Sequence, residues 1–218
     1  MPSTSCAPRR HPLFARCYAR MSQAMEQDVG EYRKQLLAGL AGRVVEVGAG
    51  NGLNFAHYPP TVTGVIAVEP EPYLRGLAHT AAEHAPVPIR VLDGHADALP
   101  VADGSVDAAV ASLVLCSVPD QARALAELAR VTRPDGELRF FEHVRADSPA
   151  LARTQRAVDL VWPLLGGGCH ASRDTLAAIT AAGFRVTSLR RLRFPDTRLP
   201  SPTSPHILGV AHRPAGMS

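Results

Sequence analysis

The stretch that decides the fold is VEVGAGNG, Val45 to Gly52. An apolar run over Arg43–Val47 leads into it, and glycines then alternate with other residues. Glycine is needed where the backbone turns tightly and approaches a ligand with no Cβ in the way. An ordinary turn between a strand and a helix uses glycine for the same reason. The stretch therefore predicts a strand, a tight turn and a helix, with a nucleotide-type cofactor site as a hypothesis.

Apolar runs and helical patterns alternate along the chain beyond this turn. Strands are expected at Arg43–Val47, Val62–Val68, Ile89–Leu92, Val106–Ser112 and Leu138–His143, with helical segments at 53–57, 71–84 and 120–132. Such alternation predicts a parallel sheet with helices on both faces.

The C-terminal part follows a different pattern. Residues 149–165 and 173–182 are expected to be helices, and Phe184–Leu192 and His206–Ala211 to be strands joined by a proline-rich loop. We therefore expect a Rossmann-like α/β fold, with a mostly parallel seven-stranded sheet and an antiparallel C-terminal strand.

The N-terminal part precedes the sheet. Residues 1–12 are rich in proline, serine and arginine and are expected to be a disordered tail. Residues 13–40 carry apolar residues at helical spacing and predict two helices that form a lid. Residues 13–218 are expected to be a single domain, as a monomer or homodimer, because the chain has 218 residues.

Composition excludes several classes of protein. The chain is 46% hydrophobic and 20% charged, which is typical of a globular protein. The net charge is +3, the basic residues are scattered, and Lys34 is the only lysine among 23 Lys plus Arg, so no nucleic-acid surface is expected. No run approaches the roughly 20 apolar residues of a membrane helix. The arginine bias favours a GC-rich, bacterial coding sequence. Residues 1–12 contain no apolar core typical of a signal peptide, so a cytoplasmic protein is expected.

The four cysteines lie far apart in the sequence and form no CxxC pair. They are Cys6, Cys17, Cys116 and Cys169. This spacing predicts reduced thiols, with neither a disulfide framework nor a metal site.

Two acidic residues strengthen the cofactor hypothesis. Glu46 lies just before the glycines, where it could accept hydrogen bonds from loop amides or, through water, from a cofactor ammonium. Glu69 ends the second strand, 21 residues after Gly48, where a carboxylate can accept both ribose hydroxyls. That spacing fits NAD as well as S-adenosylmethionine. Leu53 stands where a dinucleotide motif has its third glycine, which favours S-adenosylmethionine over NAD.

The order of motifs resembles the class I methyltransferases. GHADALP at 94–100 and ADGSVD at 102–107 look like the segment that holds adenine in that family, and LARVTRPDGEL at 128–138 looks like the turn before the fifth strand. His95 stands where the family usually has an acid, so the adenine amino group would meet His95 or Asp97. The cofactor residues expected from the loop, the acids and this resemblance are Tyr18, Glu46, Gly48, Ala49, Gly50, Gly52, Asn54, Glu69, Pro70, His95, Ala96, Asp97, Leu113 and Cys116.

A narrower resemblance runs over residues 30–212. The segments that carry it are SLVLCSV at 112–118, FFEHV at 140–144, Gly168-Cys169 with Arg173, and PHILG at 205–209. They look like the thiol methyltransferases of the methyltransferase-like 7 type, which implies methyl transfer to the sulfur of small lipophilic thiols. This chain has no hydrophobic N-terminal anchor like that of the animal members, so membrane insertion is not expected to carry over.

Candidate acceptor residues follow the ends of the strands, where open α/β sheets bind ligands. His143 is the first candidate for a general base or thiolate-orienting group, and His206 is the second. A histidine packed against backbone explains the position of His143 equally simply, and this structural role is favoured for His206. The two cysteines are typical of small apolar filler. The residues expected to contact the acceptor are Phe14, Ser117, His143, Cys169 and His170.

The helix that carries Phe14, Cys17, Tyr18 and Met21 presents them as one stripe. In related methyltransferases such a helix closes over the cofactor, and a tyrosine such as Tyr18 contacts its carboxylate end. A helix that simply covers the sheet would have the same pattern.

The sequence thus predicts an S-adenosylmethionine-dependent thiol S-methyltransferase of detoxification or secondary metabolism, acting for example on a reduced dithiol natural product and releasing S-adenosylhomocysteine. The alternatives are a C- or N-methyltransferase acting on a quinone, phenol or phospholipid head group, a binding module without turnover, and an NAD-dependent oxidoreductase.

Overall fold

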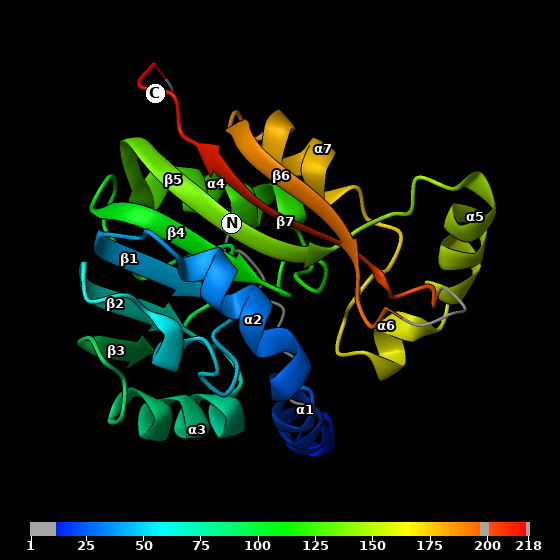
Figure 1. The fold of residues 1–218 in the computed structure, drawn as a ribbon, viewed down its shortest axis with the longest axis horizontal. Coiled ribbons are helices and arrows are strands. Elements are labelled where there is room, and N and C mark those ends of the chain that lie inside the picture. Colours follow the sequence, from blue (N-terminus) through cyan, green and yellow to red (C-terminus); the bar gives the residue numbers. More distant parts are fainter. Residues whose placement is uncertain (1–11, 197–200, 217–218) are drawn as a thin grey trace, which may run out of the picture.

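The computed structural model describes residues 12–196 and 201–216. Within them one seven-stranded sheet has the order β3-β2-β1-β4-β5-β7-β6 (Figure 1). Its strands are β1 (Gly42–Val47), β2 (Val62–Val68), β3 (Ile89–Leu92), β4 (Val106–Ser112), β5 (Thr132–His143), β6 (Arg185–Arg193) and β7 (Pro205–His212). The first five are parallel where they pair, and β7 lies antiparallel between β5 and β6. The expected Rossmann-like, mostly parallel sheet is confirmed.

Helices cover both faces of this sheet. They are α1 (Pro12–Ala24), α2 (Glu26–Leu37), α3 (Pro72–Ala82), α4 (Gln121–Val131), α5 (Pro149–Val158), α6 (Trp162–Leu165) and α7 (Thr175–Ala181), with a short 3-10 helix η1 (Phe55–His57). On one face Leu125 of α4 and Ile179 of α7 pack against Phe140. On the other, Leu36 of α2 and Ala78 of α3 belong to the core that contains Phe141. Figure 1 shows α2 in front of the sheet and α4 and α7 behind it.

Three expected element boundaries were wrong, two because of glycine or proline in the chain and one because of pairing with a neighbouring strand. The helix expected at 53–57 is only η1, because Gly52 has φ +79° and Pro59 and Pro60 follow closely. The helix expected at 149–165 is divided into α5 and α6, because Pro163 has no N–H to continue the first helix. Strand β5 begins at Thr132 rather than Leu138, with a register shift against β4.

The N-terminal helices match the expected pair, with two corrections. Pro12 already begins α1, while residues 1–11 of the expected tail lie outside the described residues. The expected stripe is divided, because Phe14 and Tyr18 are half-buried whereas Cys17 and Met21 face solvent. The buried face of α1 is made of small residues, Ala15, Ala19 and Ser22. In the described part of the chain, every helix is too short or too polar to cross a membrane.

Candidate active site

The glycine turn after β1 takes the conformation that its sequence demands. Gly48, Gly50 and Gly52 have φ values of +60°, +57° and +79°, a region that side chains rarely adopt. A Cβ at Gly48 would also overlap the side chain of Val114, in the loop after β4. The glycines thus let two loops at the C-terminal edge of the sheet approach each other.

Glu69 connects the glycine turn to the end of β2. One of its carboxylate oxygens accepts the Gly50 amide at 2.8 Å, and the other accepts the Glu71 amide at 2.9 Å. Burial raises the pKa of Glu69, although these two hydrogen bonds oppose the shift. A carboxylate offers about four acceptor positions, so both oxygens keep capacity for further donors such as hydroxyls. Pro70 follows, and Arg75 binds the carbonyls of both residues.

Glu46 is part of a buried polar network. Its oxygens accept hydrogen bonds from the Asn54 side chain at 2.8 Å and the Tyr58 hydroxyl at 2.7 Å, and Arg33 donates to Asn54 at 2.8 Å. Burial raises the pKa of Glu46 to about 7. Side chains of the segment after the turn therefore bind Glu46, rather than the loop amides expected from the sequence.

The segment expected to hold adenine lies after β3. His95 and Ala98 form an isolated antiparallel bridge, which makes a small turn. His95 is exposed, whereas Ala96 and Asp97 are half-buried. The turn places these groups at the same edge of the sheet as Glu69, because β3 pairs in parallel with β2.

Glu142 organises the loop after β4, and the sequence analysis did not predict it as a site residue. Its oxygens accept the amides of Val114 at 3.0 Å, Leu115 at 2.9 Å and Cys116 at 3.3 Å. Burial raises the pKa of Glu142 to about 7, against these three hydrogen bonds. Leu113 has φ +59°, so the chain turns sharply there. The available sequence signal was an acid inside the apolar run FFEHV, which requires buried partners.

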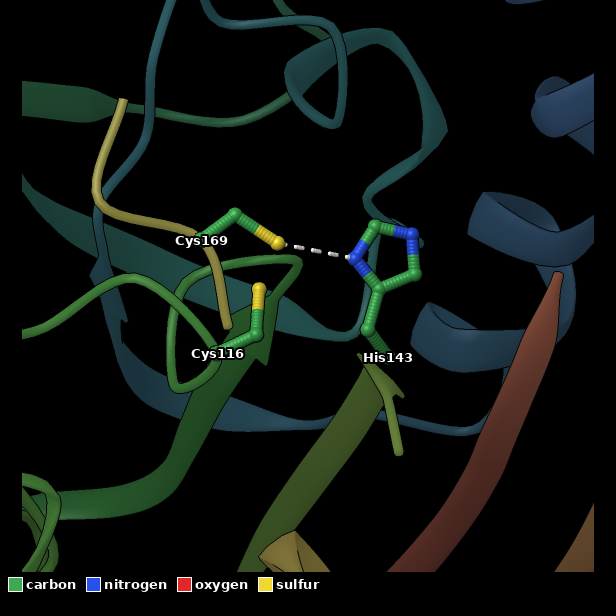
Figure 2. A group of neighbouring side chains, drawn as sticks. All are labelled: Cys116, His143 and Cys169. Atoms are coloured by element: carbon green, nitrogen blue, oxygen red, sulfur yellow. Dashed lines mark hydrogen bonds between the residues drawn. The ribbon is translucent and has the colours of Figure 1, made fainter. Parts of the chain in front are cut away.

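Two cysteines that are distant in the sequence meet the first candidate base. The ligand atoms of Cys116, His143 and Cys169 all lie within 4.8 Å of one another, and His143 Nδ1 is 3.3 Å from Cys169 Sγ (Figure 2). Cys116 and Cys169 are buried and His143 is half-buried. We call these three residues the Cys–His cluster. Cys116 and Cys169 are thus neighbours in the fold although they lie far apart in the sequence.

Hydrogen bonding inside the cluster makes its two thiols different. The pKa of the Cys169 thiol is lowered by the hydrogen bond from Cys116 and by His143, although burial opposes the shift. The pKa of Cys116 is raised by that same hydrogen bond, by burial and by the charge of Glu142. The environment thus shifts the pKa values of the two thiols in opposite directions, downward for Cys169 and upward for Cys116.

His206, the second candidate, lies beside His143. Their ring centroids are 4.3 Å apart, and His206 also stacks on Phe141 at 5.2 Å. Its Nδ1 lies 2.8 Å from the Ser204 carbonyl, and the side chain is buried. Burial, together with the neighbouring His143, lowers the pKa of His206 to about 3. His206 is therefore a neutral ring that packs against the imidazole of His143.

Tyr18 joins the cofactor side of the site to the Cys–His cluster. A Cβ at Gly50 would lie 3.6 Å from the Tyr18 ring, so the ring faces the glycine turn. Burial raises the pKa of Tyr18, and the charges of Glu69 and Cys116 add to that effect. Tyr18 is therefore close enough to Glu69 and to Cys116 for the charges of both to act on it, as expected for a residue of a helix that covers the site.

A glycine-rich segment, Gly166 to Gly168 after α6, covers the side of the site where the acceptor residues are expected. A Cβ at Gly167 would overlap the ring of Phe14, and one at Gly168 would lie 2.9 Å from the Ser117 carbonyl oxygen. Both glycines have positive φ values, +62° and +89°. The segment can therefore pack directly against α1 and the loop after β4.

Backbone hydrogen bonds fix the residues that follow the glycine-rich segment. The His170 amide donates to the Cys116 carbonyl at 2.9 Å. Asp159 accepts the amides of Ala171 at 2.7 Å and Ser172 at 3.0 Å. The expected acceptor residues from α1, the β4 loop, β5 and the glycine-rich segment therefore converge on one region. Figure 1 places α5 and α6 on the side toward which β4 and β5 point.

Comparison with known proteins agrees with this geometry. A family model described as a methyltransferase domain matches residues 45–140. Thiol S-methyltransferase TMT1A of Homo sapiens is 37% identical over 183 residues, which is 81% of this chain and 74% of the relative. Thiol S-methyltransferase TMT1B of Rattus norvegicus is 35% identical over 207 residues, 91% of this chain and 84% of the relative.

Other matches are shorter or more distant. A demethylmenaquinone methyltransferase of Renibacterium salmoninarum is 36% identical over 96 residues, 44% of this chain and 39% of the relative. An S-adenosylmethionine-dependent methyltransferase structure from Thermotoga maritima has a TM-score of 0.67 at 22% identity, covering 92% of this chain and 98% of that one. This structure shares the fold.

The chain belongs to the class I S-adenosylmethionine-dependent methyltransferases. It is an enzyme whose cofactor is S-adenosylmethionine, and it is similar to the thiol S-methyltransferases over most of its length.

The residues of the glycine turn fit this cofactor. Gly50 leaves the backbone open beneath the Tyr18 ring, and Glu69 has unused acceptor capacity for ribose hydroxyls. Asn54 is buried, and its side chain is hydrogen-bonded to Glu46 and Arg33. It therefore supports the turn from the protein interior. When bound, the cofactor supplies an electrophilic methyl group on a sulfonium.

Proposed function

We propose that this enzyme transfers the methyl group to the sulfur of a small-molecule thiol. The observation that carries the proposal is the convergence of His143, Cys169 and Cys116 beside the glycine turn, in a chain similar to thiol S-methyltransferases over 91% of its length. The shorter match to a quinone-modifying enzyme covers 44% of this chain. A match of that extent gives little support to the same acceptor, because acceptor pockets vary on a common fold.

The reaction is an in-line displacement, and it requires mainly that the nucleophile be aimed at the methyl carbon and that water be excluded. Positioning of this kind can supply several kcal/mol. A thiol of pKa about 8.5 is already a few per cent thiolate at neutral pH, so it needs less help than an amine or a phenol. We assign His143 to receive the acceptor's proton or to orient its thiolate.

The remaining acceptor contacts follow from the same convergence. Phe14 and the glycine-rich segment would cover a lipophilic acceptor, and Ser117 and His170 would flank its polar end. Tyr18 and Glu69 would hold the cofactor. We place the reaction in the cytoplasm, where thiols stay reduced, in detoxification or in secondary metabolism such as the methylation of a reduced dithiol product.

A panel of small thiols, phenols and amines, incubated with S-adenosylmethionine and analysed by mass, tests the proposal. We expect a product that is heavier by one methylene only from the thiols. His143→Ala should lower that rate at least about tenfold while cofactor binding persists, and His79→Ala, an exposed residue of α3, should not change it. Methylation of phenols or amines in place of thiols would contradict the acceptor assignment.

A further inference from the structure

The Cys–His cluster has the ligand types and spacing of a metal site. Zinc prefers cysteine sulfur and histidine nitrogen, with Zn–S near 2.3 Å and Zn–N near 2.0–2.1 Å. In a tetrahedron these bonds place two sulfurs about 3.8 Å apart and a sulfur and a nitrogen about 3.6 Å apart. The donor atoms here all lie within 4.8 Å of one another, and His143 Nδ1 is 3.3 Å from Cys169 Sγ. Shifts on the order of 1 Å would complete the geometry.

The three donors come from three different elements that hold them in place. Cys116 is bound through its amide to Glu142 and through its carbonyl to the His170 amide. His143 ends β5, where it pairs with His206 of β7. The Cys169 amide donates to the Gly166 carbonyl at 3.1 Å. Figure 2 shows the two sulfur atoms and the imidazole nitrogen directed toward one another. A ligand set of this kind is preorganised rather than assembled on binding.

Charge and burial also favour a cation at this point. Two buried thiols face each other close to Glu142, which is itself buried. A divalent cation bound to two thiolates and a neutral imidazole leaves the site without net charge, and coordination deprotonates the thiols outright.

We infer that Cys116, His143 and Cys169 bind one zinc ion and leave its fourth coordination position open. Three protein ligands with an open position are typical of catalytic rather than structural zinc sites, and the set of two cysteines and one histidine occurs among them. Soft sulfur ligands exclude magnesium and calcium as the natural occupants.

The open position identifies the class of ligand that the zinc would take. The identity of that ligand rests on the proposed function. The acceptor thiol would coordinate the zinc through its sulfur, and its proton would pass to solvent. The sulfur then forms the new bond to the methyl carbon, and the carbon–sulfur bond of the sulfonium breaks with its electron pair returning to the cofactor's sulfur. His143 then acts as a zinc ligand, which explains a thiolate-orienting role without proton transfer to its ring.

Metal binding by the full chain tests this inference without reference to activity. The protein is purified with a phosphine reductant, since dithiols bind zinc, and its zinc is measured by plasma mass spectrometry. Replacement by Co²⁺ reports the ligands, because thiolate ligands produce an intense sulfur-to-cobalt charge-transfer absorption. We expect one zinc per chain and this absorption in the wild type. Zinc well below one equivalent after exposure to the ion, or cobalt without the thiolate band, would overturn the inference.

Variants assign the ligands. Cys116→Ser, Cys169→Ser and His143→Gln should each weaken zinc binding at least about tenfold, with intact folding judged by S-adenosylmethionine binding and circular dichroism. Cys17→Ser is the matched control, because Cys17 is an exposed free thiol of α1. Unchanged zinc affinity in a folded cluster variant would contradict the assignment.

Activity separates this inference from the proposed function. Full thiol methylation by the metal-free enzyme would overturn the zinc-bound acceptor and leave the proposed function standing. Stoichiometric zinc in an enzyme that methylates only phenols or amines would overturn the proposed function and support the metal site.

Discussion

Glu46 is expected to make the stability of this protein fall as the pH rises from 5 to 8. Burial raises its pKa in the folded protein from 4.5 to about 7. Below pH 4.5 the carboxyl is protonated in both the folded and the unfolded chain, so it contributes no pH dependence. Between these two pKa values the unfolded chain releases its proton while the folded chain retains it. Raising the pH through this window therefore favours unfolding.

The size of the effect follows from the shift. Each pKa unit corresponds to about 1.4 kcal/mol, so Glu46 alone should lower the free energy of unfolding by roughly 2 to 3 kcal/mol between pH 5 and pH 8. Glu46→Gln removes the titration while keeping the shape and the hydrogen bond from Asn54. Other buried carboxyls, such as Glu142, remain in both proteins and cancel in the comparison.

Urea unfolding at a series of pH values, followed by circular dichroism, provides the measurement. The difference in free energy of unfolding between wild type and Glu46→Gln should change by roughly 2 to 3 kcal/mol between pH 5 and 8, to the disadvantage of the wild type at high pH. Glu83→Gln, a change at an exposed carboxylate, should follow the wild type. Parallel curves for the wild type and Glu46→Gln would refute the reasoning.

Three further changes test the packing of the site. Gly48→Ala should lower the free energy of unfolding by roughly 2 to 4 kcal/mol, because its φ is +60° and its Cβ would overlap Val114. The control Gly76→Ala, at an open position of α3, should leave the free energy of unfolding unchanged or raise it by up to about 1 kcal/mol. Equal effects of the two substitutions would contradict this account. Tyr18→Phe should weaken S-adenosylmethionine binding in calorimetry roughly five- to tenfold, about 1 kcal/mol, and an unchanged affinity would remove the hydroxyl from the cofactor site. Gln155→Ala should lower the free energy of unfolding by roughly 2 to 4 kcal/mol, because it removes hydrogen bonds to the backbone of residues 144, 146 and 202. An effect below about 0.5 kcal/mol would show that solvent replaces them.

Much of the fold could be predicted because its signals are local. Apolar runs such as Val62–Val68 and Val106–Ser112 mark buried parallel strands, and the structure has them at those residues. The glycine turn was predicted because only glycine adopts its positive φ values without strain. The boundaries that were missed depend on neighbours instead. Strand β5 begins at Thr132 because it pairs there with Val106 of β4, which no pattern within the segment reveals.

The candidate site divides in the same way. The sequence by itself determined the sheet, the glycine turn and the acids Glu46 and Glu69, since backbone conformation and strand ends are encoded within a few residues. Only the tertiary structure decided that Cys116 and Cys169 meet His143, and that Glu142 holds the loop after β4 that carries Cys116. These contacts join segments whose approach depends on strand order and on the closure of the glycine-rich segment over β4. Side chains distant in the sequence acquire a common chemistry only when the packed core brings their elements to one edge of the sheet.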